Sequence, residues 1–190
     1  VGPTTGTSLA LPVLIANRNY QWRIDVKLGG RTYPGSIQAF TTRGPLVVTT
    51  LADENDSGLR QGTGDSLREL LKEASPGELI RFAPSLSGRS IWLDRGPLLI
   101  NQSVTIDAAP LPDRITLDAL GKSRVFTVSA GKTVVLKGLR IANGFAPTGA
   151  GILNDGGTLT LLDCRLSENE SPGNGGGVHN ANGGSLKVSN

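Results

Sequence analysis

Methionine is absent from the 190-residue sequence, and cysteine and histidine each occur once. A single cysteine, Cys164, excludes an intrachain disulfide, so the packing of side chains has to stabilise the fold. A single histidine, His179, has no second ligand of its kind and does not make a metal site. The missing methionine indicates a processed chain or a piece of a longer one, and we favour the second interpretation.

Runs of basic residues and long apolar runs are missing as well. The 19 Lys and Arg residues are scattered, and 16 Asp and Glu residues leave a net charge of only +3. Proteins that follow phosphate backbones need clustered positive charge, so nucleic acid is not an expected partner. The longest apolar run, residues 9–15, contains Pro12 and is far shorter than the roughly 20 residues of a membrane span, so we expect no membrane segment.

Aromatic residues are scarce, at 4% of the sequence, whereas 26 glycines and 11 prolines are present. Val, Leu, Ile and Thr fill most of the apolar and branched positions. Branched residues favour strands, while glycine and proline favour the turns between them. The composition therefore predicts an all-β protein.

One pattern recurs in the last third of the chain. Residues 149–154 (GAGILN) return as 175–180 (GGGVHN), and residues 158–161 (TLTL) return as 185–188 (SLKV). The same frame fits residues 133–136 (TVVL), so the repeat measures 25 and then 27 positions. A short repeat of strand-like segments is typical of stacked coils in a solenoid.

Short strands separated by turn residues precede this repeat, with no helical segment between them. They are expected at residues 46–50, 79–82, 91–93, 98–100, 104–106, 115–117 and 125–128. Parallel strands normally need a long crossover, but a β-helix avoids it by sending each coil around three short sheets. The alternation predicts inward side chains at Val104, Ile106, Ile115, Leu117, Phe126, Val128, Val134, Leu136, Leu139, Ile141, Leu159, Leu161, Cys164 and Leu166. Cys164 aligns with Leu139, which predicts a small core hydrophobe rather than a reactive thiol.

A helix is expected just before these coils. Ser66 and Glu69 have the spacing of a capping box, and the helix ends at residues 75–77. A solenoid needs a cap over its first coil, so we interpret this segment as a lid helix. The apolar side consists of Leu67, Leu70 and Leu71, and the residues expected to face away are Arg68, Glu69, Lys72 and Glu73.

Residues 1–44 form a separate domain in this interpretation. Residues 20–27 alternate as a half-buried strand, Gly29 and Gly30 supply a turn, and residues 36–42 return with Phe40 in the core. A strand at residues 8–14 precedes them, and the linker at residues 43–45 leads to a second domain, residues 45–190. Leu14, Tyr20, Trp22 and the closing residues 40–42 (FTT) resemble the final strands of a fibronectin type III domain. That resemblance implies a partial antiparallel β-sandwich. An unrelated hairpin is the alternative.

The second domain resembles a bacterial secreted family of right-handed parallel β-helix repeat proteins. The segments that carry the resemblance are residues 47–53 (VVTTLAD), 65–69 (DSLRE), 80–86 (IRFAPSL), 104–107 (VTID), 124–128 (RVFTV) and 175–180 (GGGVHN). The nearest group has a Ser-Leu-Arg-Glu-Ala cap helix and, in many members, a C-terminal anchor called choice-of-anchor Q. Leu70 stands where that group often has alanine. The resemblance implies a pectin-lyase-like solenoid, an extracellular or cell-surface location, and anchoring of the parent protein.

Catalysis by stacked carboxylates can be tested on the repeat, because equal positions in adjacent coils lie about 5 Å apart, as the two carboxylates of a retaining glycosidase do. No two acids fall at equal positions in the aligned coils. A pair across one coil remains open through Asp94, Asp107, Asp113 or Asp118.

Arg140 and Arg165 align, which places two guanidinium groups side by side. An anionic sugar or a neighbouring acid such as Glu168 would relieve their repulsion, so the pair is a candidate glycan-binding site. Two solvated arginines are the alternative.

Two further sets of polar residues stand out. Asn154 and Asn180 occupy equal turn positions and predict a structural ladder of amides. Asp53, Asn55 and Asp56 begin like a calcium loop, but the twelfth position is Gly64, so a Ca²⁺ site there would lack the bidentate acid. His179 falls on the outward parity and is expected to be exposed.

The sequence thus favours a non-enzymatic, secreted or surface-exposed β-helix module. We expect an adhesin-like, glycan-binding role with extracellular polysaccharide or surface proteins as partners, and a monomer that forms part of a longer chain. The alternative is a carbohydrate-active enzyme of the lyase or glycoside hydrolase type, with catalytic coils outside this sequence or in the loops near residues 107–118. A pure spacer is the third interpretation. Fold alone does not choose among them.

Overall fold

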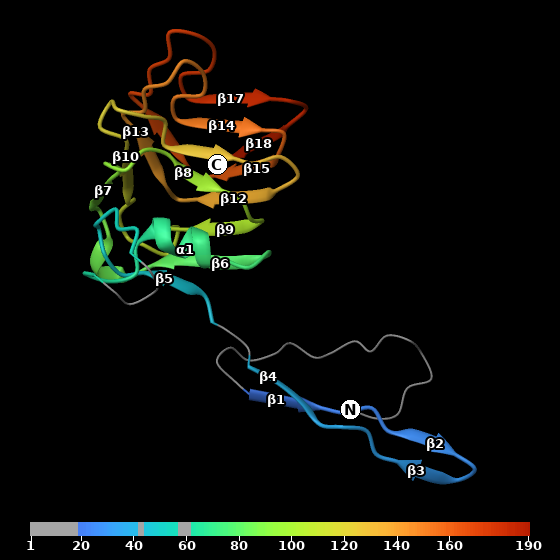
Figure 1. Ribbon diagram of the computed structural model, residues 1–190. Coiled ribbons are helices and arrows are strands. Elements are labelled where there is room, and N and C mark those ends of the chain that lie inside the picture. The colour runs from blue at the N-terminus through green and yellow to red at the C-terminus, as the bar shows by residue number, and fades with distance from the viewer. Residues whose placement is uncertain (1–18, 42–43, 57–61) are drawn as a thin grey trace. The chain divides into compact units, whose positions relative to one another are not determined.

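A computed structural model describes residues 19–41, 44–56 and 62–190 (Figure 1). Contacts within the chain divide it into two units, Val1–Pro45 and Leu46–Asn190. The sequence placed this division one residue earlier, after position 44. No helix among the described residues is long and apolar enough to cross a membrane.

The first unit contains two small antiparallel sheets. Strand β1 (Asn19–Trp22) pairs with β4 (Gln38–Thr41), and β2 (Val26–Leu28) pairs with β3 (Arg31–Tyr33). Gly29 and Gly30 form the predicted turn with positive φ angles of 56° and 77°, which suit glycine. The single strand predicted over residues 20–27 is interrupted at residues 23–25.

Phe40 is not the core residue that the alternation predicted. Its side chain is 38% exposed, and its ring stacks on that of Tyr20 with centroids 5.7 Å apart. Their sheet has only two strands, β1 and β4, among the described residues. The strand predicted at residues 8–14 lies outside the described residues.

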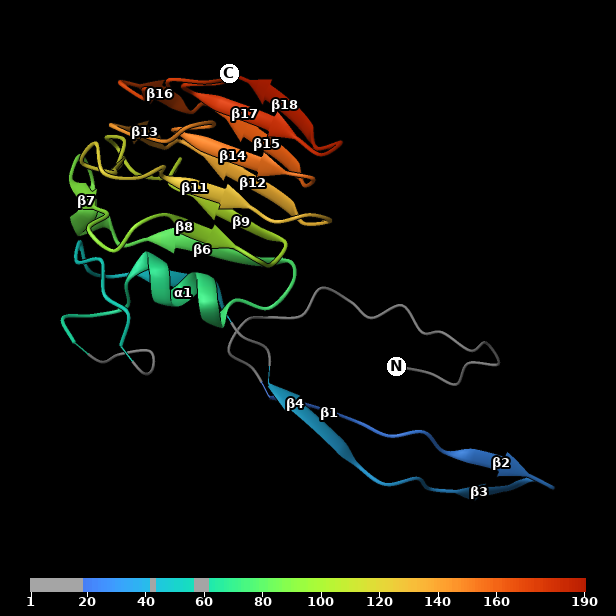
Figure 2. The ribbon, with the colours of Figure 1, turned by 45° about the horizontal axis from the view of Figure 1, so that its top comes forward.

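The second unit is a right-handed parallel β-helix, as predicted, and its strands form three sheets (Figures 1 and 2). The six-stranded sheet contains β5 (Leu46–Val48), β6 (Glu78–Phe82), β9 (Val104–Asp107), β12 (Thr133–Lys137), β15 (Thr158–Leu162) and β18 (Ser185–Ser189). The β7–β16 sheet contains β7 (Ser90–Trp92), β10 (Thr116–Asp118), β13 (Arg140–Ala142) and β16 (Arg165–Ser167). The β8–β17 sheet contains β8 (Leu98–Ile100), β11 (Phe126–Val128), β14 (Ile152–Asp155) and β17 (Val178–Ala181).

Strand register confirms the frame of the repeat. Thr133 pairs with Thr158, and Thr158 pairs with Ser185, so each coil returns in parallel to the position below it. The predicted strands are present, with ends shifted by one or two residues. The inward side chains form one continuous apolar core, in which each side chain contacts its equivalents in the coils above and below.

Cys164 belongs to the edge of this core. It packs against the buried cluster and its thiol lies 3.3 Å from the carbonyl oxygen of Leu136. Burial raises the pKa of the Cys164 thiol above its ordinary value of 9.0, although backbone hydrogen bonds act in the opposite direction. A raised pKa keeps the thiol protonated and unreactive at neutral pH.

The last coil is less buried than those before it. Leu186 and Val188 of β18 pair with Leu159 and Leu161, which are buried, yet Val188 is 64% exposed. In the described chain no further coil lies over these inward positions.

At the other end a short helix, α1 (Leu67–Glu73), lies across the first coils (Figure 2). Ser66 and Glu69 form the predicted capping box. The prediction that Arg68 and Glu69 face away from the protein is wrong, because both side chains bind the loop before the helix: Glu69 is only 3% exposed and accepts from the backbone N–H of Asp56 at 3.0 Å. After β6 in the chain, η1 (Pro84–Leu86) is a single 3₁₀ turn.

Candidate ligand-binding face

The outer face of the β7–β16 sheet carries the candidate site. Because side chains alternate along a strand, the buried residues Ile91, Leu117 and Ile141 leave their neighbours on the outside. Register arranges these outward residues in two columns. One column is Ser90, Thr116, Arg140 and Arg165. The other is Trp92, Asp118, Ala142 and Ser167, of which Ala142 is buried, with 1% exposure.

Arg140 and Arg165 do lie side by side, as the alignment predicted. Arg140 donates from Nη2 to Glu168 at 3.2 Å and from Nε to the hydroxyl of Ser167 at 3.1 Å. Arg165 is exposed, and its side chain makes no hydrogen bond or ion pair with any described residue. The neighbouring acid therefore relieves the repulsion between the arginines without an anionic ligand.

A shallow cleft of about 480 Å³ opens beside this face, at the turns that follow β10, β13 and β16. Its prominent apolar group is Phe145, whose side chain is 46% exposed. The residues that line it are Asp118, Leu120, Gly121, Asn143, Gly144, Phe145, Glu168 and Glu170.

Three successive turns build the cleft in one unusual conformation. Leu120, Asn143 and Glu168 have positive φ angles of 58°, 53° and 57°, which are uncommon for residues other than glycine. The Asp118 carboxylate supports two of these turns, since it accepts from the Leu120 N–H at 2.8 Å and from the Asn143 amide at 2.9 Å. Such residues cost energy and persist where the surrounding contacts hold them.

The loops above the turns are tied together as well. Asn169 accepts from the Gly144 N–H at 2.9 Å and donates to the carbonyl of Ile141 at 2.9 Å. The Glu170 N–H donates to the carbonyl of Gly144 at 2.8 Å, and Phe145 forms an isolated parallel bridge with Glu170. These bonds hold the backbone of the loops that line the cleft.

Chemically, the cleft combines acceptors with one aromatic surface. Three carboxylates and one amide line it, and none of its lining residues is basic. Such a site can accept hydrogen bonds from hydroxyl or amino groups while the phenyl ring contacts an apolar surface.

No family model, curated protein or solved structure matches this chain. The fold is therefore established from the structure alone. The resemblances to fibronectin type III strands and to a family cap helix rest on the sequence alone, and anchoring is only implied by the second of them.

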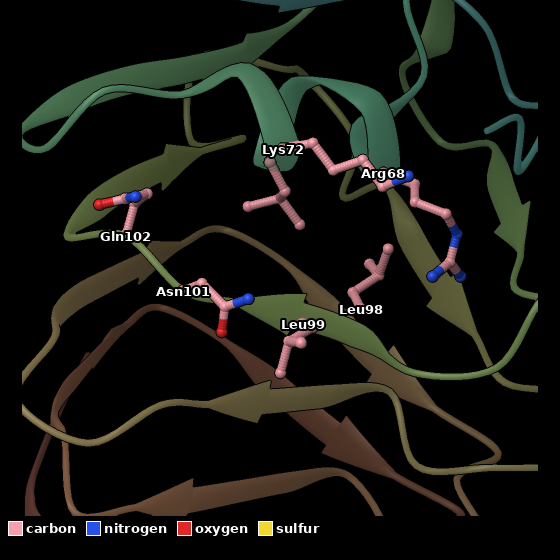
Figure 3. A pocket seen from close by; sticks show the side chains of 7 residues that line it. Arg68, Lys72, Leu98, Leu99, Asn101 and Gln102 are labelled. Carbon is pink, nitrogen blue, oxygen red and sulfur yellow. The ribbon is translucent and has the colours of Figure 1, made fainter. Parts of the chain in front are cut away.

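A second cleft, of about 330 Å³, lies between α1 and β8 (Figure 3). Lys72 projects from the helix, and Leu98 and Leu99 project from the strand. Its lining residues are Arg68, Leu71, Lys72, Leu98, Leu99, Asn101 and Gln102. The Arg68 guanidinium is committed elsewhere, to Asp53 and to the carbonyls of Gly96 and Pro97 at 2.7 and 2.9 Å. This cleft is the gap between the cap helix α1 and β8, the edge strand of the β8–β17 sheet.

The three residues predicted as calcium ligands have different partners. Both carboxylate oxygens of Asp53 accept from Arg68, at 2.6 and 2.9 Å, and Asn55 accepts from the ammonium of Lys72. Asp56 instead lies with Glu54 and Glu69, whose ligand atoms are within 4.8 Å of one another. Calcium binding stays a prediction, and the observed contacts make this region a brace between loop and helix.

Hydrogen bonds within that brace stabilise the charged form of the Glu69 carboxyl. Burial raises the pKa of the Glu69 carboxyl, but hydrogen bonds from Ser66 and from the Asp56 N–H, with the charge of Lys72, outweigh it. Its pKa therefore lies below the ordinary value of 4.5. Glu54 also contributes hydrogen bonds to the brace, since its carboxylate accepts from the N–H and hydroxyl of Thr63 at 3.0 and 2.7 Å.

Asn154 and Asn180 pair in register, and the Asn154 amide donates to the Asn180 side-chain oxygen at 2.6 Å. Asn154 also donates to the carbonyls of Gly157 and Ser185, both at 3.0 Å. Its own side-chain oxygen is buried without a partner among the described residues, because Val128 occupies the equal position in the coil below. His179, one position before Asn180, is half-buried rather than exposed.

The carboxylates considered for catalysis lie in different places and have different partners. Asp107 accepts from the Ala109 N–H at 3.1 Å and stabilises a local turn, whereas Asp118 lines the cleft with Glu168 and Glu170. The sequence pattern did not single out Phe145 and Glu170, which line the cleft, or Trp92, which is exposed on the same sheet. The usable signal was an aromatic residue in a polar turn and another on an outward strand position.

Proposed function

We propose that this chain is a non-enzymatic, extracellular or cell-surface carbohydrate-binding module. In this proposal the β-helix is the rigid support, and the ligand occupies the cleft and the adjoining face of the β7–β16 sheet. The observation that carries the proposal is the exposed ring of Phe145 beside the acceptors Asp118, Asn143 and Glu170 in an ordered cleft.

Carbohydrates match this combination of groups. A pyranose ring has apolar faces that stack on an aromatic ring, and its hydroxyl groups donate to carboxylate and amide oxygens. The exposed indole of Trp92, one strand away from Asp118, adds a second aromatic surface on the same sheet. Strand spacing places Trp92 and Asp118 about 4.8 Å apart. One extended oligosaccharide can therefore contact Trp92 and the cleft that Asp118 lines.

Location and partners follow from the same proposal. A solenoid presents a long, flat surface that suits polymers and surface proteins. Secretion and anchoring are supported by the resemblance of residues 65–69 and 175–180 to secreted β-helix proteins. Within a longer chain, the module would act as one adhesive element.

A panel of immobilised neutral, acidic and amine-bearing oligosaccharides tests the proposal. We expect at least one class to bind the intact chain and the Phe145→Ala variant to lose that binding. Leu99→Ala is the matched control, since Leu99 is an exposed apolar residue of β8, outside this cleft. Silence across the whole panel, with the fold intact by circular dichroism, would remove the proposal.

The enzyme alternative is favoured by one observation, the three carboxylates that line a single cleft. Paired carboxylates are the usual catalysts of glycoside hydrolysis. Release of reducing ends, or of unsaturated products, from any polysaccharide that binds would favour the enzyme. Binding without turnover supports the module.

A further inference from the structure

All the ionisable side chains that line the cleft are acids. They are Asp118, Glu168 and Glu170. Arg140 contacts one of them, Glu168, and partly offsets its charge. The chain as a whole has the opposite sign, with a net charge of +3. The cleft therefore differs in charge from the rest of the molecule.

Backbone pairing places Glu170 and Phe145 next to each other. Their backbones form a parallel bridge, and hydrogen bonds from Glu170 N–H to Gly144 and from Ala146 N–H to Glu170 fix both residues. The Glu170 carboxylate is exposed and makes no hydrogen bond or ion pair with any described side chain or backbone group. Bridged residues project to the same side of a pair of strands, so the carboxylate stands next to the ring.

A carboxylate beside an exposed aromatic face is a receptor for a positively charged group. The carboxylate makes a charge-assisted hydrogen bond with an ammonium, and the face of the ring attracts the same cation. An anionic sugar would meet three carboxylates, and like charges at such distances repel.

The geometry points to a saccharide with protonated amino groups as the ligand of this cleft. This inference rests on the proposed function, and it names the ligand class. Glu170 binds the ammonium, and Phe145 contacts both the cation and the sugar ring. The hydrogen bond between Asp118 and Asn143 holds the turn that carries the phenyl ring of Phe145.

Three oligosaccharides of similar length test it by calorimetry at about pH 6, where amines are protonated and carboxylates are ionised. The probes are a glucosamine oligomer, its neutral N-acetylated form, and an oligogalacturonate. We expect the glucosamine oligomer to bind tightest and its affinity to fall as salt is added. Non-specific attraction to a protein of charge +3 would favour the galacturonate instead, so this order cannot arise from net charge.

The Glu170→Gln variant isolates the charge. It keeps the shape and hydrogen-bonding capacity of the side chain, so we expect affinity for the glucosamine oligomer to drop about tenfold, the difference between a charge-assisted and a neutral hydrogen bond. Affinity for the N-acetylated oligomer should change little. Glu73→Gln on the cap helix is the matched control, because Glu73 is an exposed acid that does not line the cleft.

The outcomes separate the two proposals. Galacturonate binding as tight as glucosamine binding, or an unchanged glucosamine affinity in Glu170→Gln, would overturn the inference while leaving carbohydrate binding in place. If none of the three probes binds and the wider panel is also silent, the proposed function itself fails.

Discussion

Arg114 and Asp163 form an ion pair that spans two coils of the β-helix. The register of β10, β13 and β16 places Arg114, Gly138 and Asp163 at equal positions, each two residues before Thr116, Arg140 and Arg165. The Arg114 guanidinium reaches past Gly138 to the Asp163 carboxylate and, at 3.3 Å, to its carbonyl oxygen.

Gly138 should tolerate no side chain. Its φ is +65°, and a Cβ there would lie 2.7 Å from the backbone nitrogen of Ala109. We expect Gly138→Ala to lower the free energy of unfolding by about 2–4 kcal/mol in urea titrations, from the left-handed backbone and the contact together. Gly131→Ala is the control, because Gly131 has a φ of +70° but open space around it. Equal losses in both variants would show that the contact with Ala109 does not matter.

The ion pair of Arg68 with Asp53 should be the most important polar contact of the cap. The two side chains are 12% and 2% exposed, and the same guanidinium donates to the carbonyls of Gly96 and Pro97. We expect Arg68→Met to cost about 3–5 kcal/mol, because it leaves the Asp53 charge buried.

The double variant Asp53→Asn/Arg68→Met provides the check on that pair. It should lose clearly less free energy of unfolding than the sum of the two single changes. Strictly additive losses would mean that the two side chains act independently. Arg68→Lys should rescue little, since an ammonium cannot make the same fork of hydrogen bonds.

Glu69 should make the cap sensitive to acid. Its pKa is lowered in the folded state, so its carboxylate stabilises the fold above the ordinary pKa of 4.5. That stabilisation is lost as the pH falls through the folded-state pKa. We expect Glu69→Gln to cost about 1–2 kcal/mol at neutral pH and the difference from the natural chain to shrink in acid. A gap that stays constant with pH would contradict this, and Glu73→Gln serves as the control.

In the amide ladder, the buried Asn154 should contribute more to the free energy of unfolding than Asn180. Asn154 is fully buried, and the two hydrogens of its amide are shared among three acceptors. Asn154→Val should therefore cost about 1–3 kcal/mol by leaving carbonyl groups unpaired. Asn180→Val should cost less, since Asn180 is exposed and donates to Gly184 alone. Thermal unfolding of both variants gives the comparison. A larger loss at Asn180 would argue against a ladder supported from Asn154.

Much of the fold could be predicted from the sequence because coil formation is a local and repetitive property. The alternation of Val134 and Leu136, repeated in Leu159 and Leu161, determined the strands, their inward faces and the register that the structure confirms. The spacing of Ser66 and Glu69 similarly determined where the helix begins.

The partners of charged side chains were decided only by the tertiary structure. Arg68 and Glu69 carry charges that a helical pattern assigns to solvent, but the loop at residues 53–56 folds over them and supplies their partners. The failure at Phe40 has a similar origin, since alternation predicts a face without showing whether anything covers it.

By itself, then, the sequence determined a capped solenoid with Arg140 beside Arg165 and Asn154 beside Asn180. Only the tertiary structure brought Asp118, Phe145 and Glu170 into one cleft. Phe145 and Glu170 are 25 positions apart, the same offset as Arg140 and Arg165. They lie outside the strands that alternate apolar and polar residues, so the sequence pattern did not show which way their side chains project. Their proximity depends on left-handed turns such as that of Asn143, which the backbone adopts only when neighbouring coils hold it.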